Sequence, residues 1–243
     1  PARTAIRPLA VARTAAVACA RVKTASPADL LPLYQKCLKI ENHRLRMRNK
    51  AGGGGREVCS GRATLIDILL RTIFAQAQGT ARDAKGRAPV PLSLVALGGY
   101  GRNELNPGSD VDLMFLHDHK GAELPPDVSQ TVEQVLYPLW DVGFKVGHST
   151  RSVREAIAQA NGEMLTKTAM LEARFLIGNQ ELYQAFRARF RKHCVQGHEK
   201  EYIGARMEDQ ARRPEKFANN VYLQQPNVKR GCGGLRDYQN LLW

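Results

Sequence analysis

The chain has 243 residues and a formal net charge of +13, because 36 Lys and Arg outnumber 23 Asp and Glu. Its charge-free apolar runs, such as residues 92–97, are far shorter than the roughly 18–20 residues that cross a bilayer, which excludes a membrane-spanning helix in this sequence. The basic excess lies mostly in residues 1–60, with 12 basic and three acidic side chains. Aromatic residues are not interleaved with them, so nucleic-acid binding is disfavoured.

The cysteines give no sign of a disulfide framework or a zinc site. There are five of them, an odd number, and none forms a C-x-x-C pair. A reducing, cytoplasmic location fits this usage best. Residues 1–25 show no stable periodicity and are expected to form a basic, disordered leader; an organellar transit peptide is the alternative.

Two helices are predicted before the first strand. The first begins at Ser26-Pro27, a capping residue followed by proline at the first helical position, and ends at a glycine-rich linker over residues 50–55. The second covers about residues 63–78, where apolar residues recur every three or four positions. Residues 79–91 are polar and are predicted to form a loop.

Short apolar strands then alternate with a helix. Strands are predicted at residues 92–97, 111–116 and 144–146, with a helix over residues 128–140 between the last two. Further helices are expected at about residues 152–161, 163–177, 180–195 and 199–213, and another begins at Leu235.

The predicted class is α/β (α+β), with a small mixed sheet at its centre. The sheet forms a core over residues 86–151. An N-terminal helical segment, residues 26–85, precedes it, and a helical region, residues 152–243, follows and is expected to be truncated at its C-terminus.

The residues most informative about chemistry lie around the first two strands. Asp110 and Asp112 are two positions apart, so on a strand both carboxylates point to the same face. Two acids so close are costly unless a cation lies between them, and their hard oxygens suit Mg²⁺ or Mn²⁺. Gly98 and Gly99 end the preceding strand without side chains that would block a phosphate chain, and Ser109 adds a hydroxyl. The combination indicates metal-assisted transfer of a phosphate-bearing group.

The stretch GGYGRNELNPGSDVDL (98–113) resembles the signature of the protein-PII uridylyltransferases, which belong to the nucleotidyltransferase superfamily related to DNA polymerase β. Three further blocks resemble the same family in the same order: LWDVGFKVGHSTRSV (139–153), LEARFLIG (171–178) and PNVKRGCGGLRDYQNLLW (226–243). Asn103 and Gly108 depart from the family pattern, which more often has Gly and a bulkier residue there, and so do Arg230 and Cys232.

The resemblance implies that Asp110 and Asp112 are catalytic and bind two Mg²⁺ ions, and that UMP passes from UTP to a tyrosine of the nitrogen-signalling protein PII. Gly98, Gly99 and Ser109 would lie along the triphosphate, and Arg102 would offset its charge. Lys229 and Arg236 would close over the nucleotide. Family members continue into HD-type phosphohydrolase and ACT domains, so uridylyl removal and glutamine sensing are expected to be absent from these residues.

Other readings stay open at this point. The acceptor or the nucleotide could differ, since base selectivity depends on pocket shape. The chain could also be a non-catalytic module that binds nucleotide or nucleic acid. A third carboxylate has two candidates, Asp141 and Glu172, and His148 is either a phosphate or acceptor contact or a hydrogen-bonded residue at a strand end.

Overall fold

The structure is a computed structural model that describes residues 27–80, 90–121, 123–213, 225 and 227–243. The predicted leader and the capping residue Ser26 lie outside these residues. In the part of the chain that is described, no helix is both long and apolar enough to cross a membrane. The predicted division of the chain into residues 1–25, 26–85, 86–151 and 152–243 stays a prediction.

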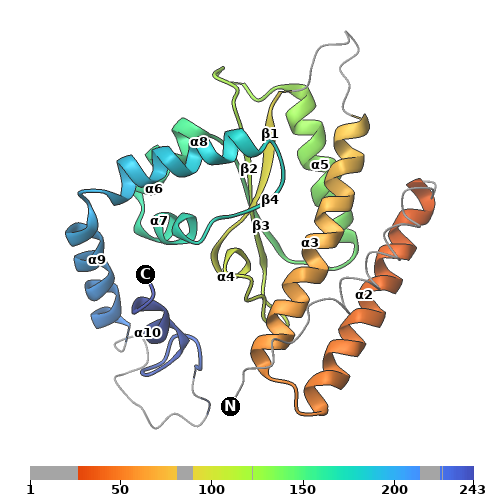
Figure 1. Cartoon of the computed structure of the whole chain (residues 1–243), viewed down its shortest axis with the longest axis horizontal. Coiled ribbons are helices and arrows are strands. Elements are labelled where there is room, and N and C mark those ends of the chain that lie inside the picture. The colour runs from red at the N-terminus through yellow and green to blue at the C-terminus, as the bar shows by residue number, and fades with distance from the viewer. Residues whose placement is uncertain (1–26, 81–89, 122, 214–224, 226) are drawn as a thin grey trace, which may run out of the picture. The chain divides into compact units, whose positions relative to one another are not determined.

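Two long helices begin the described chain and pack side by side (Figure 1). They are α2 (Pro27–Lys50) and α3 (Gly55–Thr80), which confirms both predicted helices and extends the second one toward its N-terminus. The predicted glycine linker is a tight turn, in which the Gly53 N–H donates to the Arg48 carbonyl, and α3 starts at its last glycine. The helix therefore begins earlier than its apolar periodicity indicates.

A mixed sheet forms the centre of residues 92–178, as predicted, but it has four strands where three were predicted. Its strands are β1 (Leu92–Ala96), β2 (Val111–His117), β3 (Val146–Ser152) and β4 (Arg174–Gly178), in the order β3-β2-β1-β4. Strand β1 is antiparallel to both of its neighbours, whereas β2 and β3 are parallel. The parallel pair needs a crossover, which α5 (Pro126–Asp141) provides, and the one-turn helix α4 (Gly98–Gly101) follows β1.

Two secondary-structure predictions were wrong in this region. The third strand runs over Val146–Ser152 rather than residues 144–146. The helix predicted for residues 163–177 ends at Leu171, as α7 (Met164–Leu171), and the apolar run after it is strand β4. A short apolar run fits a buried helix or a strand equally well, and here pairing with β1 decides for the strand.

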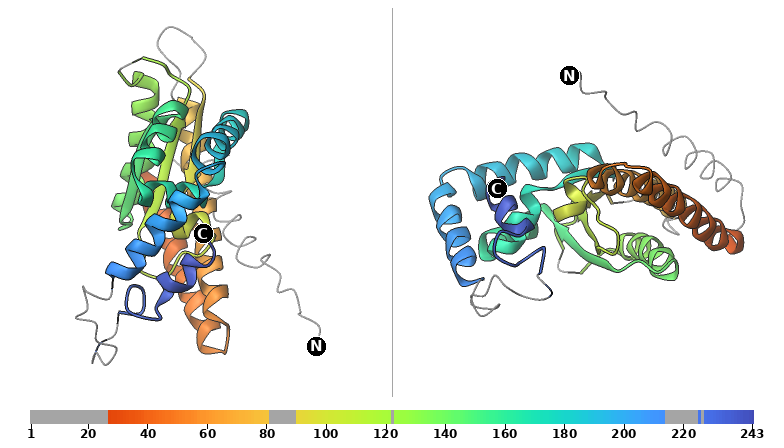
Figure 2. Two further views of the ribbon diagram at one scale, coloured as in Figure 1. Left: turned by 90° about the vertical axis from the view of Figure 1, so that its left-hand side faces the viewer. Right: turned by 90° about the horizontal axis from the view of Figure 1, so that it is seen from below.

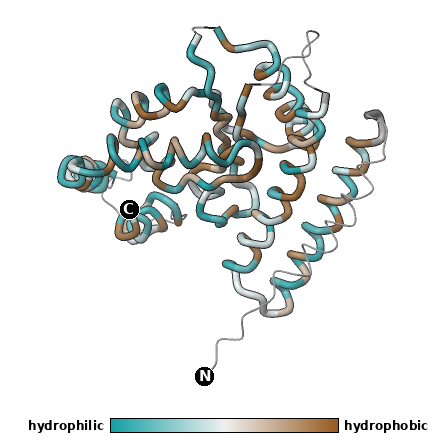
Figure 3. Tube along the Cα trace, turned by 45° about the horizontal axis from the view of Figure 1, so that its top comes forward, coloured by the Kyte–Doolittle hydropathy of each residue, from teal (hydrophilic) through white to brown (hydrophobic). Residues whose placement is uncertain are grey.

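An apolar core lies between one face of the sheet and helices α2, α3 and α5. Leu94 on β1, Phe115 on β2 and Phe74 on α3 are fully buried within it. Helix α3 packs against both α2 and α5 (Figure 2). Strands β1 and β2 are mostly apolar, and apolar residues gather at the centre of the tube in Figure 3. Burial of this face fixes which side of each strand faces away from the core.

The chain divides into two compact units, the first made of residues 1–153 and 172–185 and the second of residues 154–171 and 186–243. Helices carry most of the second unit, in agreement with the sequence. They are α6 (Val153–Gly162), α7, the end of α8 (Gln180–Phe190) with a π-helical turn (Arg191–Val195), α9 (Glu199–Arg212) and α10 (Leu235–Asn240).

Candidate active site

Asp110 and Asp112 lie at the N-terminal end of β2. Asp110 directly precedes the strand and Asp112 is its second residue. Both acids are exposed. Val111, which lies between them, and Leu113, which follows Asp112, are almost completely buried in the core. This alternation places the two carboxylates on the face of β2 opposite the core residues Val111 and Leu113, as the period of two predicts.

Two glycines on neighbouring elements flank the Asp112 carboxylate. A Cβ added to Gly98 would lie 3.4 Å from Oδ2 of Asp112, and one added to Gly147 would lie 2.5 Å from Oδ1. Gly147 is the register partner of Asp112 on β3, and Gly98 has a φ of +55°, a left-handed conformation that glycine adopts most easily. The carboxylate therefore occupies a space that both neighbours leave open. Sequence reasoning missed Gly147, because only strand pairing places it there.

The other predicted site residues between β1 and β2 are Gly99, Arg102 and Ser109; Arg102 forms ion pairs and Ser109 forms a backbone hydrogen bond. Arg102 contacts Glu172 and, at 2.9 Å, Glu104, and its side chain is 18% exposed. Beside it, a Cβ on Gly99 would lie 3.6 Å from Nη2 of Arg102. The Ser109 N–H donates to the Asn106 carbonyl, which closes the turn before Asp110.

The candidates for a third carboxylate take up other positions. Glu172 is paired with Arg102, and Asp141 is exposed at the C-terminal end of α5. Across the described ranges, no three His, Cys, Asp or Glu side chains are grouped closely enough to hold a metal ion. The exposed His148 lies beside Trp140, with 6.0 Å between the ring centroids.

Asn103, where the family pattern more often has Gly, has a structural explanation. Its φ is +64°, the single non-glycine residue with a positive φ among those described, and Asn adopts this conformation more readily than most side chains. Its side-chain amide also donates to the Ser60 hydroxyl at 3.0 Å. The position thus keeps the left-handed geometry and gains a contact to α3.

Gly101 closes the same turn against the backbone, which leads to a prediction. A Cβ at this position would lie 2.1 Å from the Glu172 carbonyl oxygen and 3.1 Å from that of Ala96. Because neither backbone group can rotate away, we expect Gly101→Ala to lower the free energy of unfolding by about 3 kcal/mol, measured by urea denaturation. Gly204→Ala on α9, where nothing lies within 4 Å, serves as the control and should not destabilise the protein. Equal stability of the Gly101→Ala and wild-type proteins would contradict the prediction.

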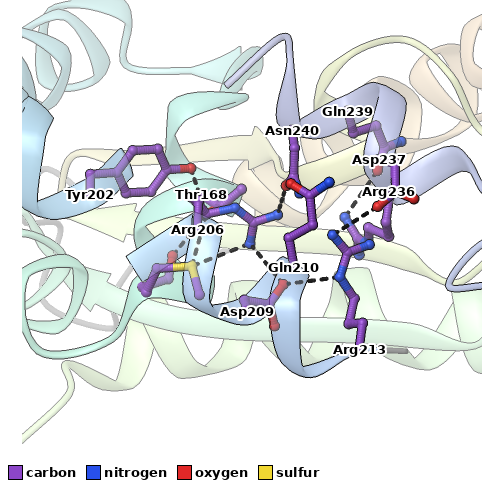
Figure 4. Close-up of polar contacts among 11 residues, drawn as sticks. Thr168, Tyr202, Arg206, Asp209, Gln210, Arg213, Arg236, Asp237, Gln239 and Asn240 are labelled. Carbon is purple, nitrogen blue, oxygen red and sulfur yellow. Dashed lines mark hydrogen bonds and ion pairs between the residues drawn. The ribbon is translucent and has the colours of Figure 1, made fainter. Parts of the chain in front are cut away.

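Lys229 and Arg236 both belong to the second unit, and Arg236 is part of its polar network (Figure 4). Arg236 donates to Oε1 of Gln239 at 3.0 Å, and its guanidinium lies 5.3 Å from the centre of the Trp243 ring. The guanidinium of Arg206, from α9, lies over the same ring, 4.4 Å from its centre. The side chain of Lys229 is exposed. Their role toward a nucleotide stays a prediction.

An ion pair fixes α10 to the end of α9. Arg213 lies 3.0 Å from Oδ1 of Asp237, which is in the first turn of α10, and 3.4 Å from Oδ2 of Asp209. Asp237 also accepts from the Gly233 N–H, and Asn227 accepts from the N–H groups of Lys229 and Arg230. The basic loop before α10 therefore has a defined backbone conformation.

Two family models match parts of the chain. Residues 201–243 match the sequence model described as GlnD PII-uridylyltransferase, and residues 63–138 match that described as glutamate-ammonia ligase adenylyltransferase. The second match includes both Asp110 and Asp112.

Two curated relatives carry the name bifunctional uridylyltransferase/uridylyl-removing enzyme. The protein from Erythrobacter litoralis is 39% identical over 190 residues, 78% of this chain and 20% of that protein. The protein from Novosphingobium aromaticivorans is 38% identical over 201 residues, 82% of this chain and 21% of that protein. The chain spans about one fifth of the length of these relatives. It belongs to the GlnD-type uridylyltransferase family.

Proposed function

We propose that this chain transfers UMP from UTP to a tyrosine hydroxyl of the signalling protein PII and releases pyrophosphate. The observation that carries the proposal is the pair of exposed acids, Asp110 and Asp112, with the Asp112 carboxylate lying between Gly98 and Gly147. The names of the relatives and of the family matched at residues 201–243 support uridylyl transfer and the PII acceptor.

The donor set fits Mg²⁺ or Mn²⁺. Magnesium in phosphate-transfer sites is held by one or two carboxylates and completes its shell with substrate phosphates and water, so a third protein carboxylate is not required. Asp110 and Asp112 would provide the anionic oxygens for the two ions. Bound there, the ions would stabilise charge on the phosphates and lower the pKa of the acceptor hydroxyl.

The chain's own residues would bind and orient the triphosphate. The backbone at Gly98 and Gly99 can approach the phosphates without a side chain between them, and the Ser109 hydroxyl can donate to a phosphate oxygen. Arg102 is paired with the carboxylates of Glu104 and Glu172, which partly neutralise its positive charge. It would therefore offset only part of the negative charge of the triphosphate. Lys229 and Arg236 are the further basic candidates.

The reaction is a displacement at the α-phosphorus. The tyrosine oxygen forms the new bond to phosphorus, the bond to the oxygen that bridges the α- and β-phosphates breaks, and pyrophosphate leaves with that oxygen. The hydroxyl proton passes to solvent. Geometry and charge stabilisation, rather than covalent chemistry by the protein, carry such a transfer.

A second candidate function is adenylyl transfer from ATP. It is favoured by the match of residues 63–138 to the adenylyltransferase model, because this range contains the glycine turn and both acids. The two candidates share the same chemistry at phosphorus and differ in the base and the acceptor.

Transfer of α-labelled nucleotide separates the candidates. We expect label from UTP, and not from ATP, on purified PII in the presence of Mg²⁺, and loss of labelling in Asp112→Asn. Asp118→Asn, which changes an exposed acid just beyond the other end of β2, is the matched control and should label as the wild type does. Labelling from ATP alone would favour adenylyl transfer. If the protein shows neither transfer nor Mg²⁺-dependent nucleotide binding, the non-catalytic module is the remaining interpretation.

A further inference from the structure

We propose that Asp67 and Arg174 are positioning residues that hold the glycine turn, residues 98–101, beside the Asp112 carboxylate. The inference rests on the proposed function and deepens it, because neither residue touches the expected reacting atoms. Asp67 comes from α3 and Arg174 from the first position of β4, so the pair joins two elements far apart in sequence.

The two side chains form a bidentate ion pair. Nη1 of Arg174 lies 2.6 Å from Oδ2 of Asp67, and Nη2 lies 3.0 Å from Oδ1. The side chains are 27% and 15% exposed, so solvent screens the pair less than it screens a surface ion pair. Two parallel bonds fix orientation as well as distance, which a single contact cannot do.

The same guanidinium also binds the backbone of the glycine turn. Its Nη2 donates to the Tyr100 carbonyl at 3.1 Å, and its Nε donates to the Gly101 carbonyl at 3.2 Å. The charged group also lies over the Tyr100 ring, 5.3 Å from its centroid. Arg174 therefore ties the last two residues of the turn to the Asp67 carboxylate.

Tyr100 adds a third connection between the turn and α3. Its side chain is 1% exposed, and its hydroxyl donates to Oδ1 of Asp67 at 2.7 Å. Burial, with the nearby Asp67 carboxylate, raises the pKa of Tyr100 well above its usual value, so the hydroxyl keeps the proton that it donates.

The position of the turn matters for the acids because the two are directly linked. The Leu97 N–H, just before the turn, donates to the Asp112 carbonyl at 3.0 Å, and Gly98 faces the Asp112 carboxylate. A shift of the turn would change the space in which a phosphate could approach that carboxylate. A misplacement of about 1 Å can cost about 100-fold in rate.

Hydrogen exchange and nucleotide binding together test the assignment. We expect Arg174→Lys to increase amide exchange in residues 98–104, where the N–H groups of Gly101, Arg102 and Glu104 are bonded within the turn. Lysine keeps the charge but cannot bridge two carboxylate oxygens and two carbonyls. We also expect the KM for UTP to rise at least tenfold, with a smaller rise in Tyr100→Phe, which loses a single hydrogen bond and retains the ring.

Arg212→Lys is the matched control, because its ion pair with Glu208 is exposed and joins residues of one helix. It should leave both the exchange in residues 98–104 and the KM unchanged. Unchanged exchange in Arg174→Lys, or an unchanged KM despite faster exchange, overturns the assignment. A wild-type protein that does not bind UTP overturns the proposed function instead, while the exchange of the variants, measured without nucleotide, still decides whether Asp67 and Arg174 hold the turn.

Discussion

Replacing either acid at the start of β2 is expected to abolish uridylyl transfer while the protein stays folded. Asp110→Asn and Asp112→Asn keep the shape of the side chain and remove one of the two anionic ligands proposed for Mg²⁺. The loss of several kcal/mol of charge stabilisation corresponds to a fall in kcat of about 1000-fold. Because both side chains are exposed, the free energy of unfolding should change by no more than about 0.5 kcal/mol.

Single-turnover transfer of labelled UMP measures the rate, and urea denaturation measures the stability. Binding of Mn²⁺, followed by paramagnetic relaxation of water, should weaken in both variants. Asp118→Asn controls for the loss of one negative charge near the same strand. Activity retained in both acid variants would place the metal site elsewhere in the chain.

The second large effect is expected at a glycine that has no chemistry of its own. Gly147→Ala adds a Cβ that would lie 2.5 Å from Oδ1 of Asp112, closer than real Cβ atoms approach other atoms. The obstructing atom is the end of a side chain, so Asp112 can rotate away and the fold can remain intact. We expect transfer to fall by about 100-fold, since a misplaced ligand of this kind loses most of its effect.

The stability of Gly147→Ala should match that of the wild type to within about 1 kcal/mol, because Ala also restricts the unfolded chain. Gly162→Ala, at a position with nothing within 4 Å, is the matched control and should keep full activity. A Gly147→Ala protein with wild-type kcat and Mn²⁺ affinity would show that the Asp112 carboxylate does not need this space. The contrast with Gly101→Ala, where the clash is with backbone, separates a loss of function from a loss of fold.

Local sequence patterns determined much of this protein. The periodicity of the long helices predicted α2, α3 and α5, and the short apolar runs predicted β1 and β2, because these signals depend on residues a few positions apart. The same local geometry predicted that Asp110 and Asp112 share one face. The motif around them also pointed to the family that the comparisons identify.

Tertiary structure alone decided the surroundings of the acids. Gly147 faces Asp112 because β3 pairs in parallel with β2, and Arg174 reaches Asp67 because β4 pairs with β1. Arg102 is held by Glu172, 70 residues away, rather than open to a ligand on all sides. Such contacts depend on register and on packing between distant segments, which no local period encodes. The sequence therefore identified the groups expected to react, and the packing of the sheet and α3 decided what holds them in place.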